Sequence, residues 1–240
     1  MRAWMASDPI ERAKYDAAYP RVSDAVTLYA WREPAFHVAR WTAQVGADAV
    51  RLGAVVPCAL AFLLFWNGHY WWGLLAAFAF SLIDFAGRML ARLTGARSRW
   101  GVALSDAVAL IHPPLWSWAW EHGLAAYGRP LEPVYATMVL WAIVAGYAAE
   151  RAIEYVFRRR FGGLDIQRWK KVDSRFALVG AQSNINLLIL AAALLFGLPD
   201  VGLELVALWT IVSLIFHAVR LAQASDQLAR GRKIASWLKA

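Results

Sequence analysis

Six long apolar stretches constrain this chain more than any other feature of its sequence. A transmembrane helix needs roughly 20 apolar residues to cross about 30 Å of hydrocarbon, and each stretch is close to that length. They lie at residues 50–66, 70–90, 102–120, 132–149, 176–197 and 201–219. The chain is 60% hydrophobic, which is too much for one soluble core of this size to bury. We therefore expect an all-α polytopic membrane protein with six transmembrane helices.

The basic residues predict the orientation of these helices. If both termini are cytoplasmic, 24 of the 25 Lys and Arg residues fall on inner segments and only Arg129 lies outside. Such a bias is the positive-inside signal of membrane proteins. We expect an integral protein of a bacterial-type inner membrane or another cytoplasm-bounding membrane. The net charge of +8 then reflects topology and attraction to anionic lipid rather than binding to nucleic acid.

Several other classes of protein are excluded or disfavoured. The chain has no P-loop, G-x-S-x-G, H-E-x-x-H or G-x-G-x-x-G pattern. Its single cysteine, Cys58, excludes an internal disulfide and a cysteine metal site. A channel or transporter is disfavoured because the ionisable residues leave no polar track through the apolar stretches. The polar first residues show no cleavable signal peptide.

The chain divides into three parts around this apolar region. We expect a polar N-terminal segment at 1–24, a membrane domain at 25–222 and a basic cytoplasmic tail at 223–240. Residues 25–48 mix aromatic and basic side chains at helical spacing. This pattern favours an amphipathic helix in the membrane interface over a soluble amphipathic helix packed on the domain. Residues 151–175 predict a helical extension of the fourth span that ends at Gly162 and Gly163.

Residues 84–109 carry a spaced motif. In order it consists of Asp84, two residues, Gly87, Arg88, two residues, Ala91, Arg92, eight residues, Gly101, three residues, Ser105, three residues and Ala109. The spacing resembles the CDP-alcohol phosphotransferase signature, D-x2-D-G-x2-A-R-x8-G-x3-D-x3-D. Three of its four Asp positions are replaced, by Gly87, Ser105 and Ala109. The run HPPLWSWAW that begins at His112 is also similar to one subgroup of that family.

The resemblance implies a function and the residues that would perform it. In that family four Asp hold divalent metals and supply the base that activates an alcohol for attack on a CDP-linked phosphate. The resemblance therefore implies a degenerate member, a non-catalytic partner or regulator in phospholipid or related lipid headgroup biosynthesis. The alternative is an active transferase with a rebuilt site, which moves a phospho-alcohol from a CDP-alcohol to an alcohol acceptor. Expected partners are membrane lipid, a CDP-alcohol, and a second copy or an active family member in a homodimer or heteromer.

Helical periodicity predicts where the site residues lie. Positions 84 and 87 share one helix face, and positions 105, 109 and 112 share another. The candidate catalytic residues are Asp84, Asp106 and His112, and Asp84 is the candidate metal ligand. The candidate cofactor-binding residues are Ala91, Arg92, Gly101 and Ser105. One carboxylate seldom holds Mg²⁺ or Mn²⁺, so we expect no tightly bound cofactor, and either ion only if the active alternative holds.

Each candidate also has a structural interpretation. Asp84 is expected to pair with Arg88 or Arg92, because a charge within the membrane needs a partner. Asp106 comes one residue after the motif position and is turned by about 100° from it; only a helix bulge near Pro113 would correct this. Asp106 would otherwise cap or solvate the start of the third span.

The remaining polar residues are open to two interpretations. His112 is a candidate base or, as the favoured interpretation, a satisfied packing residue. Four arginines could bind phosphate or reflect topology alone. They are Arg88, Arg92, Arg97 and Arg99. A polar group at the start of the fifth span, Gln182, Ser183, Asn184 and Asn186, lines a cavity or bonds between helices.

Overall fold

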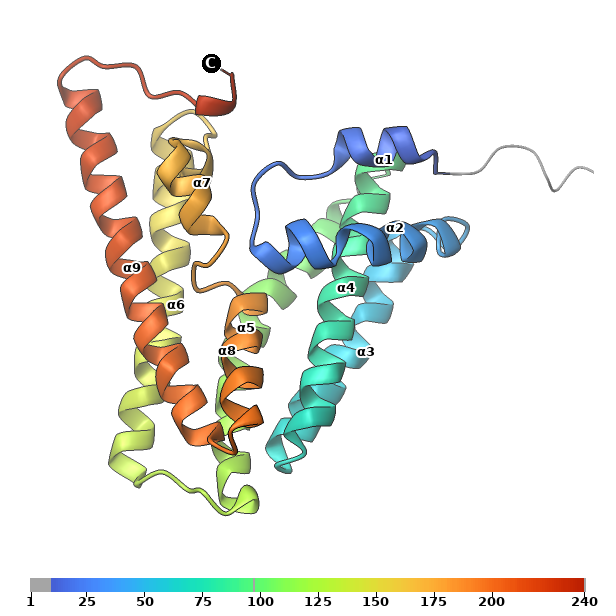
Figure 1. Cartoon of the computed structure of the whole chain (residues 1–240). Helices are drawn as coiled ribbons and strands as arrows, with labels where there is room; N and C mark the ends of the chain where they lie inside the picture. The colour runs from blue at the N-terminus through green and yellow to red at the C-terminus, as the bar shows by residue number, and fades with distance from the viewer. Residues whose placement is uncertain (1–9, 97, 240) are drawn as a thin grey trace, which may run out of the picture.

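The structure, a computed structural model, describes residues 10–96 and 98–239 and is all-helical, with no strand in that part of the chain. Arg97 of the expected basic set lies outside the described residues. The long helices run up and down in one bundle (Figure 1). The α-helices are α1 Arg12–Ala18, α2 Arg32–Trp41, α3 Ala47–Trp66, α4 Tyr70–Thr94, α5 Arg99–Tyr127, α6 Pro133–Arg160, α7 Lys171–Ala177, α8 Ser183–Leu195 and α9 Pro199–Ala229.

The bundle has two unlike ends. The short connections 67–69, 128–132 and 196–198 lie together at the lower end in Figure 1, which we call the turn end. Helices α1, α2 and α7 lie at the opposite end (Figure 1). We call this the arginine-rich end because Arg92, Arg159 and Arg168 are placed there by the last turns of α4 and α6 and the loop that follows α6.

Within the part of the chain that the structure describes, four helices are long and apolar enough to cross a membrane: α3, α4, α6 and α9. The other two expected spans look different. Helix α5 is 29 residues long, but Asp106 and His112 interrupt its apolar character. The stretch 176–197 is broken at 178–182, which leaves α8 with 13 residues, about 20 Å of helix. The six-span count therefore stays a prediction.

Apolar side chains cover the outside of the bundle as well as its core. On α3, Leu52, Val56, Leu60 and Leu63 form a stripe, and each is about half exposed or more. The opposite face of the same helix buries Ala61 and Phe65. A soluble protein rarely exposes such a continuous apolar stripe. The surface is therefore consistent with an integral membrane protein whose helices face lipid.

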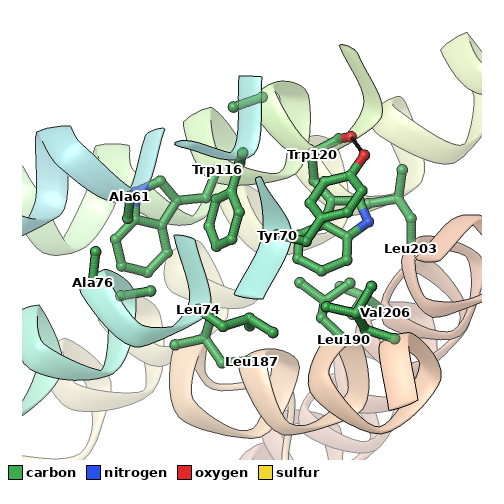
Figure 2. Close-up of a cluster of buried hydrophobic side chains, with 14 of the residues drawn as sticks. Ala61, Tyr70, Leu74, Ala76, Trp116, Trp120, Leu187, Leu190, Leu203 and Val206 are labelled. Atoms are coloured by element: carbon green, nitrogen blue, oxygen red, sulfur yellow. Dashed lines mark hydrogen bonds between the residues drawn. The ribbon is translucent and has the colours of Figure 1, made fainter. Parts of the chain in front are cut away.

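The main core ties the turn end together around two stacked rings (Figure 2). The rings of Tyr70 and Trp120 stack at 4.1 Å, and the Tyr70 hydroxyl donates to the Trp120 carbonyl oxygen at 2.8 Å. Leu190 of α8 and Leu203 of α9 close the cluster from the other side (Figure 2). Gly123 lies so close to the Phe65 carbonyl that no side chain fits there. The core thus fixes α3, α4 and α5 against α8 and α9.

The segment 10–41 folds against the arginine-rich end. A π-helical turn, Val26–Ala30, precedes α2, which buries Phe36 and Ala39 on the protein and leaves Trp41 78% exposed. The expected membrane-interfacial role of this segment stays a prediction. The expected helical extension after the fourth apolar stretch is confirmed, because α6 continues to Arg160 and Gly162 and Gly163 follow with positive φ.

Candidate functional site

A cavity of about 270 Å³ opens at the arginine-rich end. It lies between α4, α5, α6 and α8, and the N-terminal segment around residues 20–27 closes one side. Its polar lining comprises Ser23, Asp24, Thr27, Ser81, Asp84, Arg88, Arg92, His112, Tyr147, Arg151, Arg168, Gln182, Ser183 and Asn184. Three of the predicted site residues therefore line the same cavity, although they come from two different helices. They are Asp84 and Arg92 of α4 and His112 of α5.

Asp84 is held by an ion pair on its own helix. Its Oδ2 lies 3.2 Å from Nη2 of Arg88 one turn later, and the carboxylate side chain is 16% exposed. The guanidinium of Arg88 also lies over the ring of Phe85, at 5.8 Å. The expected pairing of Asp84 with a neighbouring arginine is thus present. A carboxylate already bound to a cation is a weakened ligand for Mg²⁺ or Mn²⁺.

The Ala-Arg pair of the motif divides between the core and the cavity. Ala91 is 1% exposed and packs in the cluster that joins α4 to α1 and α2. Arg92 lines the cavity two turns after Asp84. Ala91 therefore packs α4 against its neighbours, whereas Arg92 is part of the cavity lining.

The two motif glycines face α3 instead of the cavity. A Cβ atom on Gly87 would lie 2.9 Å from Cγ of Arg51, and one on Gly101 would collide with the Asp48 carboxylate. The Gly101 amide donates to Ser98 Oγ at 2.8 Å, which caps the start of α5. Arg51 itself is buried, and its Nε and Nη1 atoms have no hydrogen-bond partner. An aspartate at position 87 would therefore meet Arg51 and not an open metal site.

The expected residues of α5 do not all reach the cavity. Ala109 and His112 line it, but Ser105 does not; the Ser105 hydroxyl is buried without a hydrogen-bond partner. Asp106 is exposed on another face. Helix α5 is continuous α-helix through both prolines, so no bulge turns Asp106 toward Asp84. The cavity lining includes Asp84 but not Asp106, so this arrangement does not bring the Asp84/Asp106 pair together.

His112 is a satisfied, buried side chain. Its Nδ1 lies 2.7 Å from the Val108 carbonyl oxygen and its Nε2 lies 3.1 Å from Ser183 Oγ. Since a carbonyl only accepts, Nδ1 carries a proton, and Nε2 of the neutral ring accepts from the serine hydroxyl. The edges of Phe80 and Trp116 pack against the ring at 4.8 and 4.6 Å. This geometry favours the packing interpretation, with His112 linking α5 to α8.

A hydrogen-bond network around Asp24 closes the cavity on the N-terminal side. Asp24 Oδ1 accepts from the Thr27 amide at 2.9 Å and from Asn184 Nδ2 at 3.0 Å, and Oδ2 accepts from the Thr27 hydroxyl at 2.6 Å. Asn184 Oδ1 in turn accepts from the Ser81 hydroxyl at 2.5 Å. Asn184 therefore both lines the cavity and bonds between segments. Both Asp24 oxygens are engaged, so this carboxylate does not replace a lost metal ligand.

Sequence reasoning missed several residues of the cavity. Asp24 stood in a segment interpreted only as polar, and Tyr147, Arg151 and Arg168 lie far from the motif. Arg151 comes at the arginine-rich end of α6, where its Nη1 bonds Glu154 at 2.8 Å. Arg168 Nε lies 3.7 Å from Asp165. For Arg151 and Arg168 the only available signal was their place in the inner segment 151–175, where topology alone also predicts arginines.

Four arginines and two aspartates therefore surround the cavity. This charge balance suits an anion, and guanidinium groups bind phosphate oxygens through charge-assisted hydrogen bonds. The donor set does not fit the two-metal centre of the signature. Of the four carboxylates that centre requires, the motif supplies only Asp84, which is paired with Arg88. No protein-family model matches the chain, and no curated protein sequence matches it.

Proposed function

We propose that the cavity binds a phosphate-bearing lipid precursor or headgroup, in particular a CDP-linked alcohol, without metal-dependent transfer. The observation that carries this proposal is the gathering of Arg88, Arg92, Arg151 and Arg168 around a polar cavity to which the motif contributes one carboxylate, Asp84. Arginines attract a diphosphate, and the motif no longer supplies the carboxylates that would hold the activating ions.

In this proposal the chain is a degenerate CDP-alcohol phosphotransferase, a pseudoenzyme of the membrane. It acts as a partner or regulator in phospholipid or related lipid headgroup biosynthesis, either as a homodimer or in a heteromer with an active enzyme. The same proposal includes six spans, an N-terminal interfacial helix and both termini in the cytoplasm. The spacing of Asp84, Ala91, Arg92 and Gly101 and the positive-inside bias support it.

Ligand binding by the full chain in lipid nanodiscs tests the proposal. The probes are CDP-diacylglycerol and soluble CDP-glycerol, with CMP and phosphatidic acid as the separate nucleotide and lipid-phosphate arms. We expect a CDP-alcohol to bind, and Arg92→Gln to weaken it about tenfold, the value of one lost charge-assisted hydrogen bond. Arg99→Gln is the matched control, because Arg99 is exposed and lies outside the cavity lining.

Two results would contradict the proposal. If neither CDP-alcohol binds, or if Arg92→Gln and Arg99→Gln bind equally well, the cavity is not a phosphate site. If the protein releases CMP from a CDP-alcohol in a Mg²⁺- or Mn²⁺-dependent manner, it is an active transferase, and the non-catalytic role is wrong.

A further inference from the structure

A second group of ionisable side chains lies between α6 and α9, apart from the motif. Glu150 and Glu154 are one turn apart on α6, and His217 faces them from α9. One potential ligand atom from each residue lies within 4.8 Å of the other two. Glu150 and His217 are among the most buried polar residues of the bundle, at 1% and 5% exposure.

The packing of α6 on α9 brings these residues together. One turn before Glu150, Gly146 meets Thr210 of α9, and a Cβ atom there would lie 2.8 Å from Thr210 Cγ2. The close approach is therefore possible because position 146 has no side chain. From α7, the ring of Phe176 packs edge-on against His217 at 5.7 Å. An apolar ring thus covers the imidazole on that side.

Three atoms of this group are buried without a hydrogen-bond partner: Glu150 Oε2, Glu154 Oε1 and His217 Nδ1. His217 Nδ1 lies 2.7 Å from Glu150 Oε1, yet this contact lacks hydrogen-bond geometry. Buried polar atoms are almost always paired, because an unpaired one loses its hydration without compensation. These atoms converge from two helices, so a single species between them would satisfy all three.

The two carboxylates of this group share one arginine. Arg151 Nη1 bonds Glu154 Oε2 at 2.8 Å, and its Nη2 is 3.9 Å from Glu150 Oε2. One guanidinium faces two carboxylates, so a second positive charge is required in this buried space. A divalent cation supplies that charge and, unlike a proton on His217, also provides a partner for the imidazole nitrogen.

We propose that Glu150, Glu154 and His217 bind a divalent transition-metal ion, with Zn²⁺ or Mn²⁺ as the best match. Imidazole nitrogen favours such ions over Mg²⁺ and Ca²⁺, and carboxylate oxygen is a ligand that both Zn²⁺ and Mn²⁺ accept. Such a set leaves a coordination position open. Arg151 contacts the group and also lines the arginine-rich cavity, so the ion would lie beside the cavity. The three proposed ligands take no part in the proposed function, although Arg151 borders both sites.

Titration of metal-stripped full chain in detergent tests the site, with Co²⁺ as the spectroscopic probe and Zn²⁺ as the competitor. We expect one Co²⁺ per chain, displaced by Zn²⁺, with visible absorption bands of a protein-bound ion. Glu150→Gln and His217→Gln should each weaken binding about tenfold or more. His122→Gln is the matched control, because His122 is an exposed histidine of α5 that stacks on Trp66. Asp84→Asn reports whether the motif binds the ion instead.

A second measurement does not depend on the folding of variants. Pulsed electron paramagnetic resonance of Mn²⁺ bound to the unmodified protein should show coupling to an imidazole nitrogen. No stoichiometric binding, or bound Mn²⁺ without nitrogen coupling, would overturn the site and leave a buried ion-pair cluster with a protonated His217. Binding that survives both Glu150→Gln and His217→Gln, or that is lost in Asp84→Asn alone, would overturn it as well.

Discussion

The Tyr147 hydroxyl of α6 donates a hydrogen bond to the main-chain carbonyl oxygen of Ala109 in α5, at 2.7 Å. That carbonyl would normally accept from the amide of residue 113, but Pro113 has no N–H. Tyr147 thus satisfies an acceptor that the proline leaves free, and it does so at the cavity wall, which both residues line. The contact replaces one of the two main-chain hydrogen bonds that Pro113 and Pro114 remove from α5.

We predict that Tyr147→Phe lowers the stability of the protein by about 0.5–1 kcal/mol, because it removes one hydrogen bond between helices of a membrane bundle. The measurement is thermal unfolding in detergent. Tyr155→Phe on the same helix is the control, since Tyr155 is 63% exposed and should leave the melting temperature unchanged. Equal melting of the two variants would show that the Ala109 carbonyl finds another donor.

Gly87 and Arg51 should be energetically coupled. A methyl group at position 87 meets Cγ of Arg51 at 2.9 Å, and overpacking of this kind costs about 1–3 kcal/mol. Gly87→Ala should therefore destabilise the protein, and less so when Arg51→Ala is present, with a coupling of about 1 kcal/mol in a double-mutant cycle. Gly53→Ala is the control, because open space surrounds that helical position. Additive effects of the two changes would contradict the contact.

The attachment of α1 to α2 should depend on pH. Arg12 donates to Asp16 and Glu33 at 2.9 and 2.6 Å, and these hydrogen bonds hold the pKa of each carboxyl below its usual value. A lowered pKa in the folded state means stabilisation that is complete above the normal carboxyl pKa and is lost as the pH falls through the lowered one. Protease cleavage within α1 should accordingly accelerate in that acidic range.

Glu33→Gln should give the same rapid cleavage of α1 at neutral pH. Glu11→Gln is the control, because among the described residues the Glu11 carboxylate pairs with Lys14 of α1 itself, at 3.2 Å. Cleavage rates that do not change with pH, or that rise equally in both variants, would show that Tyr15 and the apolar contacts alone hold α1.

Labelling of single cysteines tests the proposed topology. In a Cys58→Ser background, a membrane-impermeant maleimide should label Pro130→Cys in intact cells and Arg159→Cys only after the membrane is opened. The reason is the positive-inside bias, which assigns the connection with Arg129 to the outer side. Both positions are exposed and lie at opposite ends of the bundle (Figure 1). The reverse labelling pattern would make the assignment of both termini wrong.

Local sequence patterns predicted the helices better than their membrane roles. Each apolar stretch gave a helix, because hydrophobic runs of this length have few other ways to satisfy their backbone. The end of α6 was also predictable from the sequence, because Gly162 and Gly163 adopt positive φ values that other residues rarely accept. The break at 178–182 was missed. There the Ala181 amide bonds Ser213 Oγ of α9 at 2.9 Å, a contact that no local pattern reports.

The sequence by itself determined an all-helical chain with apolar helices. It also determined that Asp84 shares a helix face with the arginines one and two turns later, and that Asp106 comes one residue after the motif position. These properties follow from helical periodicity and hydrophobicity, which act between neighbours in the chain. Tertiary structure alone decided that Asp24 reaches Asn184, that Gly87 faces Arg51, and that Glu150 meets His217. Such contacts depend on how helices far apart in sequence pack, because interhelical distance is set by the volume of the side chains between them.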